Sequence, residues 1–202
     1  MKALIHLVHP YVYKLQGNEF IIGPIQEYFQ RDRNVTHFLS SALDKGHQVL
    51  HHRNHHPHSF NGALQDVSFR MDKLYSAVLF NPRIDLVTTS SLGTPFPDER
   101  PKEIPLERWN AYLANFSTDS QFKEKLRPRE TTFFIGGCLD ACLANAISYY
   151  TLHHRGTSEP LFYVPELCVV WNQSKLKEVE RKLQDLNALP LPYEDALQRL
   201  KK

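Results

Sequence analysis

The sequence predicts an α/β fold in three layers, with a mostly parallel central sheet and helices on both of its faces. Short apolar segments are bounded by Gly, Pro or charged residues, which is the pattern of strands buried on both sides. Segments with apolar residues at helical spacing alternate with them along the chain. A length of 202 residues suits one sizeable core and is too short for two ordinary domains with a linker, so we expect a single domain over residues 1–202.

Five apolar segments are expected to form strands: residues 3–8, 47–52, 76–80, 131–135 and 161–164. Between the first two, a helix is indicated by Val35, Phe38, Leu39, Ala42 and Leu43, and it ends at Lys45 and Gly46 as a C-cap. Further helices are expected at about 141–153 and along Leu176, Val179, Leu183 and Leu186. The proline-rich stretch 82–130 is expected to form long loops over one edge of the sheet. Functional groups in such a sheet gather at the carboxyl ends of the strands.

Charge and cysteine content narrow the class of protein. The 24 basic and 22 acidic residues give a formal charge of +2 and are spread along the chain, which does not favour a nucleic-acid or membrane partner. The N-terminal segment lacks a signal-peptide core, and no apolar run approaches the roughly 20 residues needed to span a bilayer. Three cysteines indicate reduced thiols rather than a disulfide framework. We therefore expect a cytoplasmic protein.

The segment FFIGGCLDAC points to chemistry at Cys142. Two glycines follow an apolar strand and allow a tight turn, Asp140 is a plausible helix N-cap, and Cys142 then falls in the first helical turn. The helix dipole favours a thiolate there, and additional positive charge lowers a thiol pKa from about 8.5 into a range of roughly 3.5 to 7.5. The N–H groups of the same turn, at Gly137, Asp140 and Ala141, are candidates for stabilising an oxyanion. Cys142 is thus the candidate nucleophile.

Two other interpretations of these cysteines remain open. Cys138 and Cys142 would serve equally well as small buried hydrophobic residues at the strand-to-helix junction, with Asp140 as a cap only. Redox exchange between the two thiols is the second alternative, although three intervening residues differ from the usual redox motif.

The cysteine segment resembles the nucleophile segment of the isochorismatase-like cysteine hydrolases, the superfamily that includes nicotinamidases. The resemblance lies in Gly136, Asp140, Cys142 and Leu143, whereas Ala146 stands where the family usually has threonine. The order of strands, helices and histidine segment agrees over most of the chain. The resemblance implies an isochorismatase-like fold, a small-molecule amide substrate cleaved through a thioester on Cys142, and a homo-oligomer.

The run HHRNHHPHSF is similar to a metal-binding segment of the nicotinamidases. The resemblance places Asn54 at the position of a ligand aspartate and His56 and His58 at the two ligand histidines, followed by Ser59 and Phe60. It implies a divalent metal such as zinc or iron, to which an amide is a poorer ligand than the carboxylate it replaces. A solvated loop at a strand end is the alternative.

The resemblance also implies an aspartate at the end of the first strand and a lysine at the end of the third. No aspartate is present in the first strand, and the equivalent position falls on Val8 or His9. A histidine there would accept the thiol proton and return it to the leaving amine, or would serve only as a structural hydrogen-bonding group. Lys102 is the candidate lysine, with Lys73 as a competing match. Loss of both aspartates is also what a catalytically silent binding protein of this fold would show.

Overall fold

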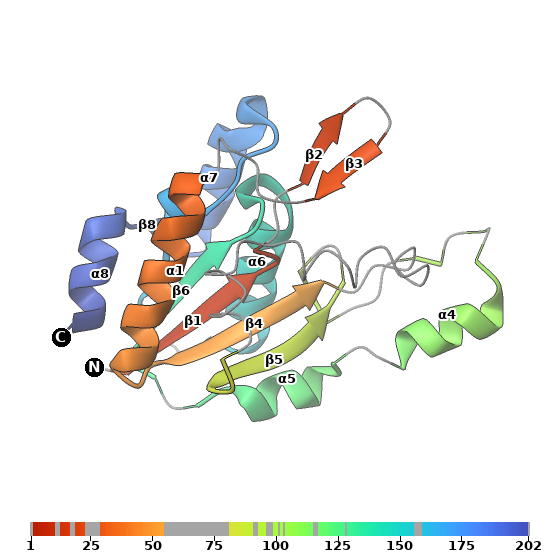
Figure 1. Ribbon diagram of the computed structural model, residues 1–202, viewed down its shortest axis with the longest axis horizontal. Coiled ribbons are helices and arrows are strands. Elements are labelled where there is room, and N and C mark those ends of the chain that lie inside the picture. Colours follow the sequence, from red (N-terminus) through yellow and green to blue (C-terminus); the bar gives the residue numbers. More distant parts are fainter. Residues whose placement is uncertain are drawn as a thin grey trace.

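The computed structural model is organised around a parallel sheet of six strands (Figure 1). It describes residues 2–10, 13–16, 19–22, 29–54, 81–90, 93–95, 99–100, 102, 104–114, 117–127, 129–155 and 159–201. The strand order is β5-β4-β1-β6-β7-β8. The strands are β1 (Ala3–Val8), β4 (Gln48–Asn54), β5 (Ile84–Thr89), β6 (Thr131–Gly136), β7 (Leu161–Tyr163) and β8 (Ala188–Pro190). Because all neighbouring strands of this sheet pair in parallel, their carboxyl ends lie at the same end of the sheet.

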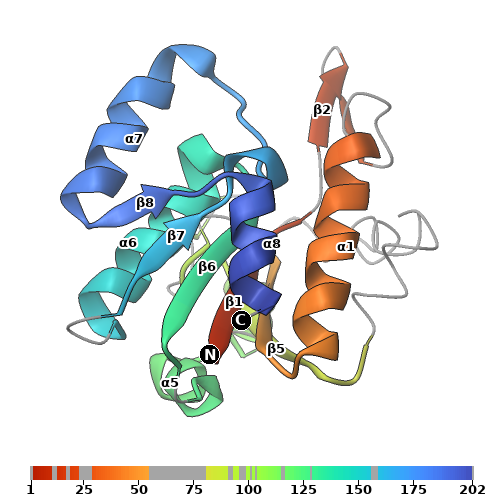
Figure 2. The same ribbon diagram turned by 90° about the vertical axis from the view of Figure 1, so that its left-hand side faces the viewer.

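Helices cover both faces of this sheet (Figure 2). One face carries α1 (Phe29–Asp44) and α8 (Tyr193–Lys201), which pack on the side chains of Ile5 and Leu7. The other face carries α5 (Asp119–Lys125), α6 (Ala144–His153) and α7 (Leu176–Asp185), which pack on Leu4 and Val8. The alternation along β1 is the two-residue period of a strand buried on both sides. The expected three-layer α/β architecture is therefore confirmed.

The remaining elements are smaller. An antiparallel hairpin of β2 (Tyr13–Gln16) and β3 (Glu19–Ile22) extends beyond the carboxyl end of β1 (Figure 1). Helix α4 (Leu106–Leu113) precedes α5, and short helical turns are η3 (Leu139–Leu143), η4 (Pro165–Leu167) and η5 (Gln173–Lys175). None of the described helices is long and apolar enough to cross a membrane.

The expectation of long loops over residues 82–130 was wrong in part, because this stretch contains β5, α4 and α5. Strand β5 lies at the edge of the sheet, and along it Leu86 is exposed while Val87 is buried. An edge strand of this kind lacks the continuous apolar run by which the central strands were recognised. Strand β8 and helix α8 were also missed, and the strand expected at 76–80 lies outside the described residues.

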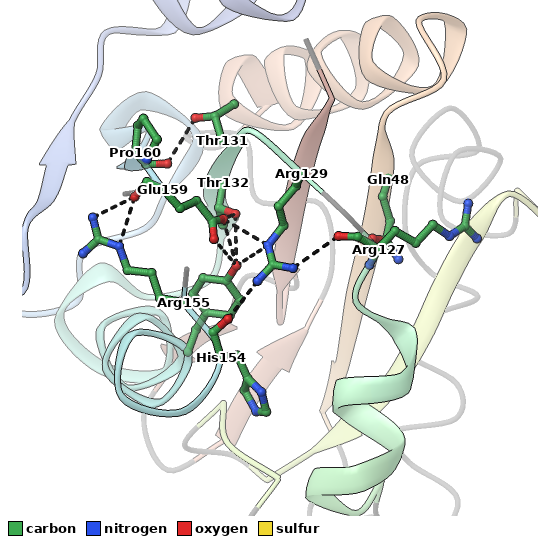
Figure 3. Close-up of polar contacts among 10 residues, drawn as sticks. Gln48, Arg127, Arg129, Thr131, Thr132, His154, Arg155, Glu159 and Pro160 are labelled. Atoms are coloured by element: carbon green, nitrogen blue, oxygen red, sulfur yellow. Dashed lines mark hydrogen bonds and ion pairs between the residues drawn. The ribbon is translucent and has the colours of Figure 1, made fainter. Parts of the chain in front are cut away.

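A polar network fastens α6 to the amino-terminal ends of β6 and β7 (Figure 3). Arg129 forms an ion pair with Glu159, whose carboxylate also accepts hydrogen bonds from the hydroxyls of Tyr150 and Thr132. The Arg129 guanidinium donates further to the carbonyl oxygen of His154 at 2.9 Å. Since both strands begin here, this network lies at the end of the sheet opposite to the carboxyl ends of the strands.

Candidate functional site

The strand register places several of the residues predicted from the sequence at the carboxyl ends of the strands. Val8, the last residue of β1, pairs with His52 of β4 and with Gly136 of β6. The register of β4 with β5 places Asn54 opposite Thr89. His9, Thr89 and the turn after Gly136 therefore lie together at the carboxyl ends of the strands, where functional groups of parallel sheets gather.

The turn that carries Cys142 differs from the expected helix start. Residues Leu139–Leu143 form a single wide helical turn, and Ala141 has non-helical dihedral angles of φ −145° and ψ −106°. The N–H groups of Ala141 and Leu143 both donate to the carbonyl oxygen of Cys138 at 3.0 Å. Regular helix begins only at Ala144, so the expected start near residue 141 was wrong by three residues. Cys142 lies in the kinked turn just before α6.

Two glycines make room for this turn. A Cβ atom on Gly137 would lie 2.7 Å from Cys142 Sγ and 2.8 Å from the carbonyl oxygen of Val8. A Cβ atom on Gly93, which has φ +79°, would lie 2.4 Å from the carbonyl oxygen of Cys142. Because both contacts are shorter than a real Cβ tolerates, larger residues at these positions would displace the Cys142 turn.

Asp140 does not act as the expected N-cap. Its carboxylate accepts hydrogen bonds from the backbone N–H groups of Trp171 and Asn172, both at 2.9 Å. The kink at Ala141 separates Asp140 from the start of α6, which has no side-chain cap. Asp140 instead fastens the turn to the chain that follows β7 and η4.

The Cys142 thiol is 7% exposed and lies among polar partners. Its pKa is lowered well below the ordinary thiol value, first because the Cys138 thiol donates a hydrogen bond to it. Burial opposes this effect, while a hydrogen bond and positive charge from His9 add to it. The same thiol–thiol contact, together with burial, raises the pKa of Cys138. Cys138 is therefore the proton donor of the pair, and Cys142 carries the thiolate character.

His9 reaches the thiol from the end of β1. It has φ +35°, in the left-handed region that a non-glycine residue seldom adopts, and its N–H donates to the carbonyl oxygen of His52 at 3.2 Å. Its Nε2 atom lies 2.9 Å from the Thr89 hydroxyl, which orients the ring. The structure thus brings His9 and Cys142 together.

Behind His9, three further histidines are buried and neutral. His6 and His52 are hydrogen-bonded to each other at 2.8 Å, and the His6 ring stacks on Phe134 at a centroid distance of 4.2 Å. Burial is the main cause that lowers the pKa of His6 and His52, and it lowers the pKa of His51 to about 3. These rings form part of the core and carry no charge at neutral pH.

Sequence analysis missed Arg31, which is 7% exposed on α1. Its guanidinium donates to the carbonyl oxygens of Pro10 and Gly136 and pairs with Asp32. A signal was present, because Arg31 precedes Val35 by four residues and Phe38 by seven, on the same apolar helix face. Arg33, only two residues away, is exposed.

The remaining candidates are a lysine and three metal ligands. Lys102 is exposed in the turn before α4. Asn54 ends β4, whereas His56 and His58 lie outside the described residues. Among the residues that the structure describes, no group of three or more His, Cys, Asp or Glu side chains could hold a metal ion.

The N–H groups expected to bind an oxyanion are partly engaged. Gly137 donates to the carbonyl oxygen of Val8, and Ala141 donates to that of Cys138. An oxyanion bound by Gly137 and Ala141 would have to displace these two bonds.

Comparisons with known proteins show the fold. No protein-family model and no curated protein matches the sequence. N-carbamoylsarcosine amidase from Thermoplasma acidophilum is similar in structure, with a TM-score of 0.60 and 11% identity over 96% of this chain and 98% of that one. The pyrazinamidase of Pyrococcus horikoshii, solved in complex with zinc, gives 0.56 and 10% over 95% and 99%. The MAR1 ribonuclease from Caenorhabditis elegans gives 0.58 and 7% over 98% and 81%.

These likenesses confirm the isochorismatase-like fold that the cysteine segment implied. The neighbours are two amidases and one ribonuclease by name, and their sequence identities to this chain are low. The reaction must therefore be argued from the residues of this chain.

Proposed function

We propose that this chain is a cysteine-dependent hydrolase that cleaves a small non-peptide amide through a thioester on Cys142, in the manner of a nicotinamidase. The observation that carries the proposal is the contact of the buried Cys142 thiol with the His9 ring. A nucleophile within hydrogen-bonding reach of a base, which a third group orients, is the arrangement that covalent catalysis requires. Thr89 is the orienting group here.

The chemistry follows from these contacts. The Cys142 thiolate attacks the carbonyl carbon of the amide, and the thiol proton resides on His9. As the C–N bond breaks, His9 gives this proton to the leaving nitrogen, so that an amine or ammonia departs and a thioester remains. Water then attacks the thioester while His9 accepts a proton from it. The carbon–sulfur bond breaks, the acid is released, and the thiolate is restored.

Two assignments within this site stay predictions. Lys102 would act as an electrostatic partner of the carbonyl oxygen, which requires its segment to approach the strand ends. Asn54, His56 and His58 would hold a zinc or iron ion that orients the substrate, and no step above passes through that metal. Metal analysis of the purified protein, with and without the His56→Ala change, tests the second assignment.

The rival function is a silent member of the fold that binds a small molecule or a protein. It is favoured by the partners of Cys142, which are a thiol and an imidazole in place of the carboxylate that the family resemblance implied. Binding of a carboxamide without turnover would identify this function.

Alkylation and turnover separate the two functions. Iodoacetamide near pH 6 should label Cys142 faster than a free model thiol, as located by peptide mass spectrometry. Small carboxamides, with nicotinamide and pyrazinamide as probes, should release ammonia with the wild-type protein and not with Cys142→Ala or His9→Ala. Hydroxylamine should trap the thioester as a hydroxamate. Labelling no faster than the free thiol would overturn the hydrolase proposal.

A further inference from the structure

Arg31 joins the two strand ends that carry the candidate catalytic pair. Its guanidinium donates two hydrogen bonds to the carbonyl oxygen of Pro10, at 2.9 and 3.1 Å, and one to that of Gly136 at 3.2 Å. Pro10 directly follows His9, and Gly136 directly precedes the turn of Cys142. One planar group on α1 therefore links the chain beside the imidazole to the chain beside the thiol.

Arg31 supplies donors to these two carbonyl groups from outside the sheet. Pro10 lies two residues beyond the end of β1. Gly136 is the last residue of β6, and at its φ of +107° the chain turns away from the strand. A buried carbonyl oxygen that loses a hydrogen-bond donor destabilises the fold. The fork of an arginine donates to two acceptors in fixed directions, which the single ammonium of a lysine cannot reproduce.

The guanidinium also brings positive charge near two of the three thiols. Its charge acts to lower the pKa of both Cys138 and Cys168, which flank the Cys142 turn in the core. Asp32, the partner of the Arg31 ion pair, is itself partly exposed, so water weakens its neutralising effect. The charge of Arg31 therefore acts on the Cys138 and Cys168 thiols.

We propose that Arg31 is a positioning residue that fixes the His9 and Cys142 segments relative to each other. The proposal deepens the proposed function and rests on it. At the strand ends Arg31 contacts only backbone carbonyl groups, so it acts through His9 and Cys142.

The pH dependence of Cys142 alkylation tests this role in the full-length protein. Iodoacetamide rates are measured across pH for the wild type, Arg31→Gln, Arg31→Lys and the matched exposed control Arg33→Gln. On the acidic limb of the profile we expect a rate about tenfold lower for Arg31→Gln, since the His9 contact that lowers the pKa of Cys142 would be lost, which shifts that pKa by roughly one unit. Arg31→Lys keeps the charge without the fork and should be about threefold slower. Arg33→Gln should match the wild type.

Circular dichroism and thermal melting establish that each variant is folded before its profile is used. If Arg31→Gln does not fold, Arg31→Lys decides, and a wild-type profile for that variant overturns the proposal. A folded Arg31→Gln with the wild-type midpoint overturns it as well. Failure of the proposed function looks different, because the wild-type thiol would then react no faster than a free thiol. That result overturns both proposals, whereas a fast wild type with unaffected variants overturns only the role of Arg31.

Discussion

Removing the hydrogen bond from Cys138 to Cys142 is the most direct test of how this site activates the Cys142 thiol. Changing Cys138 to Ala removes the donor by truncating the side chain at its Cβ atom. A hydrogen bond to a charged acceptor is worth about 1.5–3 kcal/mol, and about 1.36 kcal/mol corresponds to one pKa unit. The pKa of Cys142 should therefore rise by roughly one to two units in the Cys138→Ala variant.

The assay is the rate of Cys142 alkylation as a function of pH, with the label located by mass spectrometry. The midpoint of the profile should move upward by the same roughly one to two units. Cys138→Ser retains a hydroxyl donor and should move the midpoint less. Cys168→Ala is the matched control, because the Cys168 thiol is buried in the same core and donates to the carbonyl oxygen of Val164 at 3.1 Å. An unchanged midpoint in Cys138→Ala would refute the assignment of Cys138 as the donor.

Three further predictions concern stability and the imidazole. The free energy of unfolding should fall as the pH drops below about 6.5, because the buried pair His6 and His52 has a lowered pKa in the folded state and takes up protons on unfolding; urea titrations at pH 7.5 and 5.5 measure this. Glu159→Gln should destabilise the fold by about 1.5–3 kcal/mol in the same titration, since it removes the charged partner of the half-buried Arg129. Thr89→Val removes the hydroxyl that orients the strand-end imidazole, and should slow amide turnover several-fold with little change in melting temperature.

Each of these has its own control. Equal stability at the two pH values would contradict the first prediction. For the second, Glu178→Gln breaks an exposed ion pair with Lys182 and should leave stability unchanged, so equal effects of the two changes would contradict it. For the third, Thr88→Val alters the neighbouring, half-buried residue of the same strand and should retain turnover.

Local patterns were sufficient for the central strands and for locating the turn that carries the candidate nucleophile. Strands β1 and β6 are buried along their whole length, and their sequences are therefore mostly apolar. The glycine-rich turn before Cys142 was recognisable because its constraints lie within seven residues. Asp140 shows where such reasoning fails, since a short-range cap was expected and the partners lie 31 and 32 residues away.

What the sequence by itself determined is the fold class, the position of the candidate thiol and the presence of a histidine at the end of the first strand. Only the tertiary structure decided which groups surround that thiol. Thr89 lies 80 residues from His9, and Gly136 lies 105 residues from Arg31, so their contacts depend on which strands and helices become neighbours. The sequence pattern records whether a side chain is buried, because burial selects for residue type, but it does not record which distant side chain or carbonyl group meets it.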